Sequence, residues 1–98
     1  MNDAAAPMPD LQDQVIAWDV VDSLLDDIAA TTRLFSVLIK SAAATLAEGA
    51  TPDLAAARRA LTGGQAVQLR YLYQGTEWWD TLIPSGEQVR IVRVQQTA

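Results

Sequence analysis

Residues 67–83 read Val-Gln-Leu-Arg-Tyr-Leu-Tyr-Gln-Gly-Thr-Glu-Trp-Trp-Asp-Thr-Leu-Ile, and this stretch decides the fold. In its first seven residues, large apolar side chains recur at every second position, which is the period of a β-strand. Gln74-Gly75 fits a two-residue hairpin turn because glycine accepts a positive φ angle at little cost. The stretch therefore predicts two antiparallel strands joined at Gln74-Gly75, with the return strand running from Thr76 to Ile83.

A second turn and a third strand follow directly. Pro84-Ser85-Gly86 has the composition of a turn. Residues 89–94 are dense in valine and isoleucine, whose branched side chains favour strands. We therefore expect a three-stranded antiparallel β-meander over residues 66–94.

The turn at Gln74-Gly75 also sets which residues share a face. It places Arg70 opposite Trp79 and Tyr71 opposite Trp78, since side chains alternate along each strand. One face then carries the larger apolar groups and should meet the helices: Val67, Leu69, Tyr71, Tyr73, Trp78 and Leu82. The other carries Gln68, Arg70, Leu72, Glu77, Trp79, Thr81 and Ile83. A turn shifted by one residue would exchange the two faces.

The N-terminal half follows helical spacing instead. Apolar residues recur every three or four positions from Leu11, after a candidate N-cap at Asp10, and continue to about Glu48 before Gly49. Thr31-Thr32 interrupts this pattern without a glycine or proline. The pattern is compatible with one long bent helix or with two helices joined near residues 30–32, and continuity is slightly favoured.

A further helix is predicted after Thr51-Pro52-Asp53, which combines an N-cap, a proline in the first turn and an acidic residue. Gly63-Gly64 should end it. The predicted fold class is thus α+β, with N-terminal helices packed on a C-terminal three-stranded antiparallel β-meander. We expect a flexible arm over residues 1–9 and a single domain over residues 10–98, helical over 10–62 and a β-meander over 66–94.

The composition limits the chemistry of the chain. Its 98 residues include no histidine and no cysteine, which removes imidazole bases, thiolate nucleophiles and the commonest transition-metal ligands. We therefore predict no enzyme, no catalytic residue, no metal site and no cofactor. We find no apolar run of membrane-spanning length and no basic, apolar leader at the N-terminus, so we expect a cytoplasmic protein.

Charge is unevenly distributed along the chain. The net charge is −5, and eight of the 12 acidic residues lie within residues 1–50 beside only Arg33 and Lys40. An acidic chain is a poor non-specific ligand for DNA or for an anionic membrane. The acidic group at Asp19, Asp22, Asp26 and Asp27 is interpreted as a solvated helix face, because a rigid helix cannot wrap an ion.

Trp79 is the residue that stands out, because it is large, apolar and on the more polar face of the predicted hairpin. Arg70 can lie over its ring in a cation–π contact. Two interpretations stay open. In one, a partner covers a patch of Trp79, Leu72, Arg70 and Ile83, which Val92 could extend. In the other, the chain's own helix or N-terminal arm covers it. The partner interpretation predicts a small interaction or regulatory module that forms a homodimer and binds a further, unidentified protein.

One other class of ligand remains. Arg70, Arg90 and Arg93 beside Tyr71, Tyr73, Trp78 and Trp79 could stack single-stranded nucleic acid on the sheet. The acidic net charge and the expected burial of half of the aromatic residues speak against it. Catalysis by Glu77 and Asp80 is disfavoured as well, because strand alternation points their side chains to opposite faces.

Overall fold

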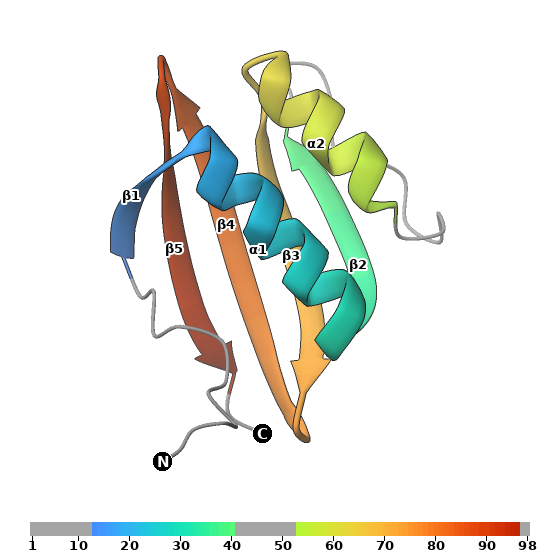
Figure 1. Ribbon diagram of the computed structural model, residues 1–98. Coiled ribbons are helices and arrows are strands. Elements are labelled where there is room, and N and C mark those ends of the chain that lie inside the picture. Colours follow the sequence, from blue (N-terminus) through green and yellow to red (C-terminus); the bar gives the residue numbers. More distant parts are fainter. Residues whose placement is uncertain (1–12, 41–52, 97–98) are drawn as a thin grey trace.

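The computed structural model describes residues 13–40 and 53–96, which form a five-stranded antiparallel sheet and two helices (Figure 1). Along the chain the elements are β1 (Asp13–Ala17), α1 (Trp18–Thr31), β2 (Arg33–Lys40), α2 (Leu54–Thr62), β3 (Ala66–Tyr73), β4 (Thr76–Ser85) and β5 (Gln88–Gln96). In space the strands follow the order β1-β5-β4-β3-β2. Both helices lie on the same side of the sheet, so the fold has two layers.

The predicted meander is present as β3, β4 and β5. Tyr73 pairs with Thr76, and the register then runs through Arg70 opposite Trp79 to Val67 opposite Leu82. Gln74 and Gly75 both have positive φ angles, 53° and 81°, which is the backbone of a tight two-residue hairpin turn. The turn on which the division of faces depended is therefore confirmed. The second turn begins two residues later than expected, at Gly86, because β4 continues past Ile83 through Pro84 to Ser85, which pairs with Gln88.

The prediction of a long N-terminal helix is wrong, and with it the prediction of a three-stranded sheet. Residues 13–17 form an edge strand paired with β5, and residues 33–40 form the opposite edge strand, paired with β3. Only residues 18–31 of that stretch are helical. Apolar residues in 33–40 satisfy helical spacing, but they also lie on both sides of a strand, and short apolar runs do not separate the two by periodicity.

The helix breaks where the sequence pattern was interrupted, at Thr31-Thr32. Thr32 has extended backbone angles, φ −125° and ψ 170°. The hydroxyls of Thr31 and Thr32 each donate a 2.7 Å hydrogen bond to a carbonyl one turn back, those of Asp27 and Ile28. The Ile28 carbonyl also accepts the backbone N–H of Thr32 at 3.1 Å, and hydroxyl bonds of this kind to a carbonyl one turn back tend to bend a helix. Two threonines thus end α1 without a glycine or proline.

The second predicted helix is present as α2. The carboxylate of Asp53 accepts a 2.9 Å hydrogen bond from the backbone of Ala55, so Asp53 itself is the N-cap. The predicted roles of Thr51 and Pro52 fall outside the described residues, as do those of Asp10, Gly49 and the arm at 1–9. At the other end, Gly63 is the C-cap and Gly64 adopts a φ of 88°, which confirms the predicted stop.

The core lies between the helices and one face of the sheet. Its fully buried sheet residues include those predicted to face the helices, Val67, Leu69, Tyr71 and Leu82. The helices contribute Val21, Leu24, Leu25, Ile28, Ala57, Ala60 and Leu61, and β5 adds Val89 and Ile91. Each large aliphatic side chain buried in this way contributes about 1.5–3 kcal/mol. The helical layer therefore covers one sheet face and leaves the other to its own side chains.

No helix in the described part of the chain has the length and the apolar character needed to cross a membrane.

Candidate partner-binding face

We call the sheet face opposite α1 and α2 the open face. The strand registers place on it the apolar residues Val15, Leu38, Leu72, Trp79, Ile83, Val92 and Val94. They place on it the polar residues Asp13, Arg33, Ser36, Lys40, Gln68, Arg70, Glu77, Thr81 and Arg90. All four residues predicted to bind a partner are in this set. Val15, Ile83 and Val94 are among the most exposed large apolar residues of the described chain, at 58%, 38% and 48%.

Trp79 and Arg70 form the centre of the open face. The guanidinium carbon of Arg70 lies 3.9 Å from the centroid of the Trp79 ring, as the register predicted. The ring N–H of Trp79 donates a 2.6 Å hydrogen bond to the Glu77 carboxylate. A cation over an indole face is worth about 0.5–1 kcal/mol at an exposed site. The indole therefore has a cation on one side and a carboxylate at its polar edge, which fixes its orientation on the sheet.

The polar contacts continue along β3. Arg70 Nε donates a 2.9 Å hydrogen bond to the side-chain oxygen of Gln68, and the Gln68 amide donates a 3.1 Å bond to the Thr81 hydroxyl. Together with Trp79 and Glu77, these residues form a connected chain across two strands. Such a network holds its members in defined rotamers.

The four predicted residues do not form one compact patch. Arg70 is directly opposite Trp79, and Leu72 is diagonal to it, opposite Glu77. Ile83 lies farther along the same face of β4, beyond Thr81 and opposite Arg90. The apolar neighbour directly opposite Trp79 is Val94, which the sequence analysis did not assign to the site. The sequence signal that bears on Val94 is the position of the second turn, because that turn sets which residue of β5 stands opposite Trp79.

The predicted alternative, in which the chain's own helix covers Trp79, finds no support among the described helices. Both α1 and α2 pack on the other face (Figure 1). The proposed role of the N-terminal arm concerns residues outside the described ranges. Among residues 13–40 and 53–96, then, no helix or strand lies over the open face.

An exposed ion pair marks the β1 end of the open face. Arg90 donates two hydrogen bonds to Asp13, at 3.0 and 2.9 Å, and thereby ties β1 to β5. The hydrogen bonds from Arg90 lower the pKa of Asp13 below its ordinary value of 3.8. The charges of Arg90 and Asp13 compensate each other within the face.

The helix-covered face holds a different polar group. Arg93 Nε and Nη2 donate to the two carboxylate oxygens of Asp80 at 2.8 and 2.7 Å, and the Tyr71 hydroxyl donates to Asp80 at 2.9 Å. All three side chains are buried. Burial is the main reason that the pKa of the Tyr71 phenol is raised far above its usual value, and the Asp80 charge adds to it.

This buried group corrects the nucleic-acid alternative. Tyr71 and Arg93 are inside the protein, and Tyr73 and Trp78 pack against the core from the same side. Only Arg70, Arg90 and Trp79 of the seven residues in that hypothesis are left on the open face. The same parity separates Glu77 from Asp80, as predicted, so the two carboxylates do not form an acid–base pair.

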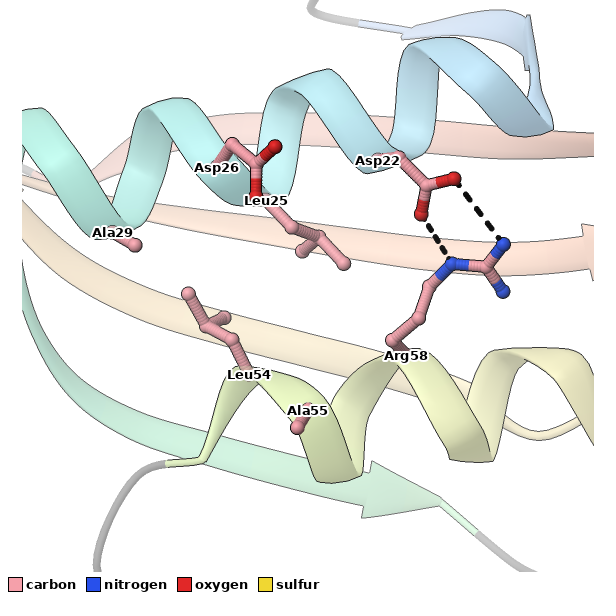
Figure 2. A pocket seen from close by; sticks show the side chains of 7 residues that line it. All are labelled: Asp22, Leu25, Asp26, Ala29, Leu54, Ala55 and Arg58. Carbon is pink, nitrogen blue, oxygen red and sulfur yellow. Dashed lines mark hydrogen bonds and ion pairs between the residues drawn. The ribbon is translucent and has the colours of Figure 1, made fainter.

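A shallow groove of about 410 Å³ lies between the two helices (Figure 2). Apolar side chains of both helices line it, with Asp22 and Asp26 on the α1 side and Arg58 on the α2 side. Arg58 binds Asp22 through Nε and Nη2, and its guanidinium also lies 4.8 Å from the Trp18 ring centroid. The hydrogen bond from Arg58 lowers the pKa of Asp22. The described residues bring no three potential metal ligands together, in this groove or elsewhere.

The chain matches no protein-family model, no curated protein and no solved structure.

Proposed function

We propose that the protein is a non-enzymatic interaction module that pairs with a second copy of itself through the open face. The observation that carries the proposal is that Trp79, Arg70, Leu72 and Ile83 lie on the one sheet face that no described helix covers. A second sheet packed face to face would lie about 10 Å away and bury these side chains.

The charges of the face support this occupant. Burying a charged group costs several kcal/mol unless a partner compensates it. On the open face Asp13 is paired with Arg90, and Glu77 and Arg70 both contact Trp79. These four charges would keep their contacts under a covering sheet, and Arg33 and Lys40, which form no ion pair among the described residues, lie at the β2 edge of the face where a second sheet need not cover them. A two-fold contact uses the same face on both copies. The exposed apolar side chains of Ile83 and Val94 would therefore be buried in each copy.

We also propose that the protein has no catalytic role, and this part of the proposal rests on the composition. The chain has no histidine or cysteine, and Glu77 and Asp80 point to opposite faces of the sheet. An interaction role needs only the geometry of the face.

The molar mass in solution tests the proposal. Sedimentation equilibrium of the unmodified chain should give a dimer at micromolar concentration. Ile83→Arg should weaken the dimer by about 2 kcal/mol, which is roughly 30-fold in Kd. The matched control is Val20→Arg, which places the same charge at a similarly exposed residue, 41% against 38%, on α1.

Two results would contradict the proposal. One is a monomeric mass for the unmodified chain at concentrations of several hundred micromolar. The other is a dimer whose Kd does not respond to Ile83→Arg, because that dimer would use another surface.

A further inference from the structure

The outer edge of β2 is a second surface with the features of a binding site. β2 pairs with β3 on one side, and no other described strand pairs with its other side (Figure 1). Such an edge presents a row of backbone N–H and C=O groups that can accept another strand. β2 has eight residues, against five for β1 at the opposite edge, so it offers the longer template.

A bulge in β2 controls which side chains share a face. Leu34 pairs with Tyr71 and Ser36 pairs with Arg70, so Phe35 is the extra residue. Phe35 is 43% exposed. Because of this extra residue, Arg33 and Lys40 pair with Leu72 and Ala66, which are an even number of positions apart. Both basic side chains therefore project from the same face of β2, one near each end.

These two basic residues differ from three of the arginines elsewhere in the fold. Arg58, Arg90 and Arg93 each form an ion pair with an aspartate. Arg33 and Lys40 are exposed and form no ion pair with any residue in the described ranges. The edge thus carries two uncompensated positive charges at the ends of an apolar strand.

The charges decide between possible occupants of the edge. If β2 of a second copy paired antiparallel with this edge, Arg33 of one copy would stand opposite Lys40 of the other, twice. Like charges directly opposite each other destabilise a strand pair. A second copy is therefore disfavoured here, and a strand with acidic residues at both ends is favoured.

We propose that the outer edge of β2 binds an extended segment of a partner protein by strand addition, with acidic residues six positions apart opposite Arg33 and Lys40. The spacing follows from β3, a regular strand on which the partners of Arg33 and Lys40 are Leu72 and Ala66, six positions apart. Backbone hydrogen bonds supply the affinity in this mode of recognition, and side chains at alternate positions supply the specificity. The alternate positions of the segment point to the helix-covered face, and apolar residues there would extend that face beside Val37 and Ile39.

The test uses two synthetic peptides with the sequences Glu-Val-Thr-Val-Thr-Val-Glu and Lys-Val-Thr-Val-Thr-Val-Lys, each labelled for fluorescence anisotropy. The full chain should bind the acidic peptide at least tenfold more tightly than the basic one at low salt, and the difference should shrink as salt is added. The double variant Arg33→Glu/Lys40→Glu should reverse this preference. Lys40→Glu alone should weaken binding of the acidic peptide, whereas the matched control Arg59→Glu, an equal change of charge on the exposed side of α2, should not.

Hydrogen exchange of the β2 amides gives an independent measurement. In the free protein the amides that point outward from β2 should exchange fast, and the acidic peptide should slow them. Equal binding of the two peptides, no binding of either at low salt, or a preference unchanged in the double variant would each overturn the proposal. Outward amides already protected in the free protein would also overturn it, because the edge would then be paired. Ile83→Arg, which acts on the open-face dimer through β4 and not through β2, should keep the preference for the acidic peptide, so failure of one proposal can be told from failure of the other.

Discussion

Asp80 and Arg93 stand directly opposite each other on β4 and β5 and form a two-point ion pair on the helix-covered face of the sheet. Their side chains are 0% and 2% exposed, so neither charge is solvated by bulk water. The pair bridges neighbouring strands within a largely aliphatic core. A change in the register of β4 and β5 would therefore separate two buried opposite charges.

Removing one member of this pair should cost much stability. Arg93→Met leaves the Asp80 carboxylate buried without its cation, which typically costs about 3–5 kcal/mol in the free energy of unfolding. Urea denaturation followed by circular dichroism measures the change. Arg90→Met on the same strand is the matched control, and it should change stability little because Arg90 is exposed. Equal losses in the two variants would contradict the assignment.

Removing both members should restore part of that stability. In Asp80→Leu/Arg93→Met no uncompensated charge remains, and apolar side chains of similar size take the place of the pair. We expect the double variant to be more stable than Arg93→Met alone by about 1–2 kcal/mol, measured in the same urea series. A double variant that is less stable than the single one would show that the carboxylate has a role beyond balancing Arg93.

The Tyr71 phenol should make the fold sensitive to alkali. Its pKa is raised in the folded protein above the ordinary value of 10.0. Its contribution to stability is therefore fully present below pH 10 and is lost as the pH rises further, because the unfolded chain ionises first. From about pH 9 to pH 11 the urea midpoint should fall more steeply for the unmodified chain than for Tyr71→Phe. Tyr73→Phe removes the other phenol and should keep the steep fall. Identical slopes for Tyr71→Phe and the unmodified chain would contradict this prediction.

Two exposed ion pairs should be visible as acid-shifted carboxyl titrations. The pKa of Asp13 and that of Asp22 are lowered by hydrogen bonds from Arg90 and Arg58, so these contacts are present above pH 3.8 and are lost as the pH falls through the lowered values. NMR titration of the carboxyl carbons measures each pKa directly.

Each pair provides the control for the other. Arg90→Gln should return the pKa of Asp13 toward 3.8 and leave that of Asp22 unchanged, and Arg58→Gln should do the reverse. Asp13 titrating at or above 3.8 in the unmodified chain would show that β1 is not held to β5 by this contact in solution.

The part of the fold that local signals specify could be predicted. The alternation from Val67 to Tyr73 and the glycine at position 75 together identify a hairpin and its register, because a two-residue turn leaves only one pairing. The contact between Arg70 and Trp79 follows from that register. The same reasoning identified α2, whose capping residue Asp53 and terminal glycines act within a few residues of sequence.

The edge strands could not be predicted in this way. Asp13 pairs with Val92, across most of the chain, and Arg33 pairs with Leu72. Nothing local marks either pairing, and the apolar residues around them fit a helix as well as a strand. Non-local pairing overrides a weak helical preference once a sheet edge is available to complete.

The candidate sites divide along the same line. Trp79 and Arg70 were placed on one face by a turn that the sequence shows, whereas Val94 and Arg93 depended on a second turn whose position the proline and glycine did not define. Arg93 looked like a surface cation because buried arginine is rare. Its burial became acceptable only when the register brought Asp80 opposite it.

By itself, the sequence determined the hairpin around Gln74-Gly75, the division of its faces and the exclusion of imidazole and thiol chemistry. The tertiary structure alone decided that residues 33–40 are an edge strand, that β1 completes the opposite edge, and that both helices cover the face away from Trp79. The physical reason is the range of the interactions: turns, caps and alternation act between neighbours in sequence. Strand pairing and the compensation of buried charge need partners that only the folded chain brings together.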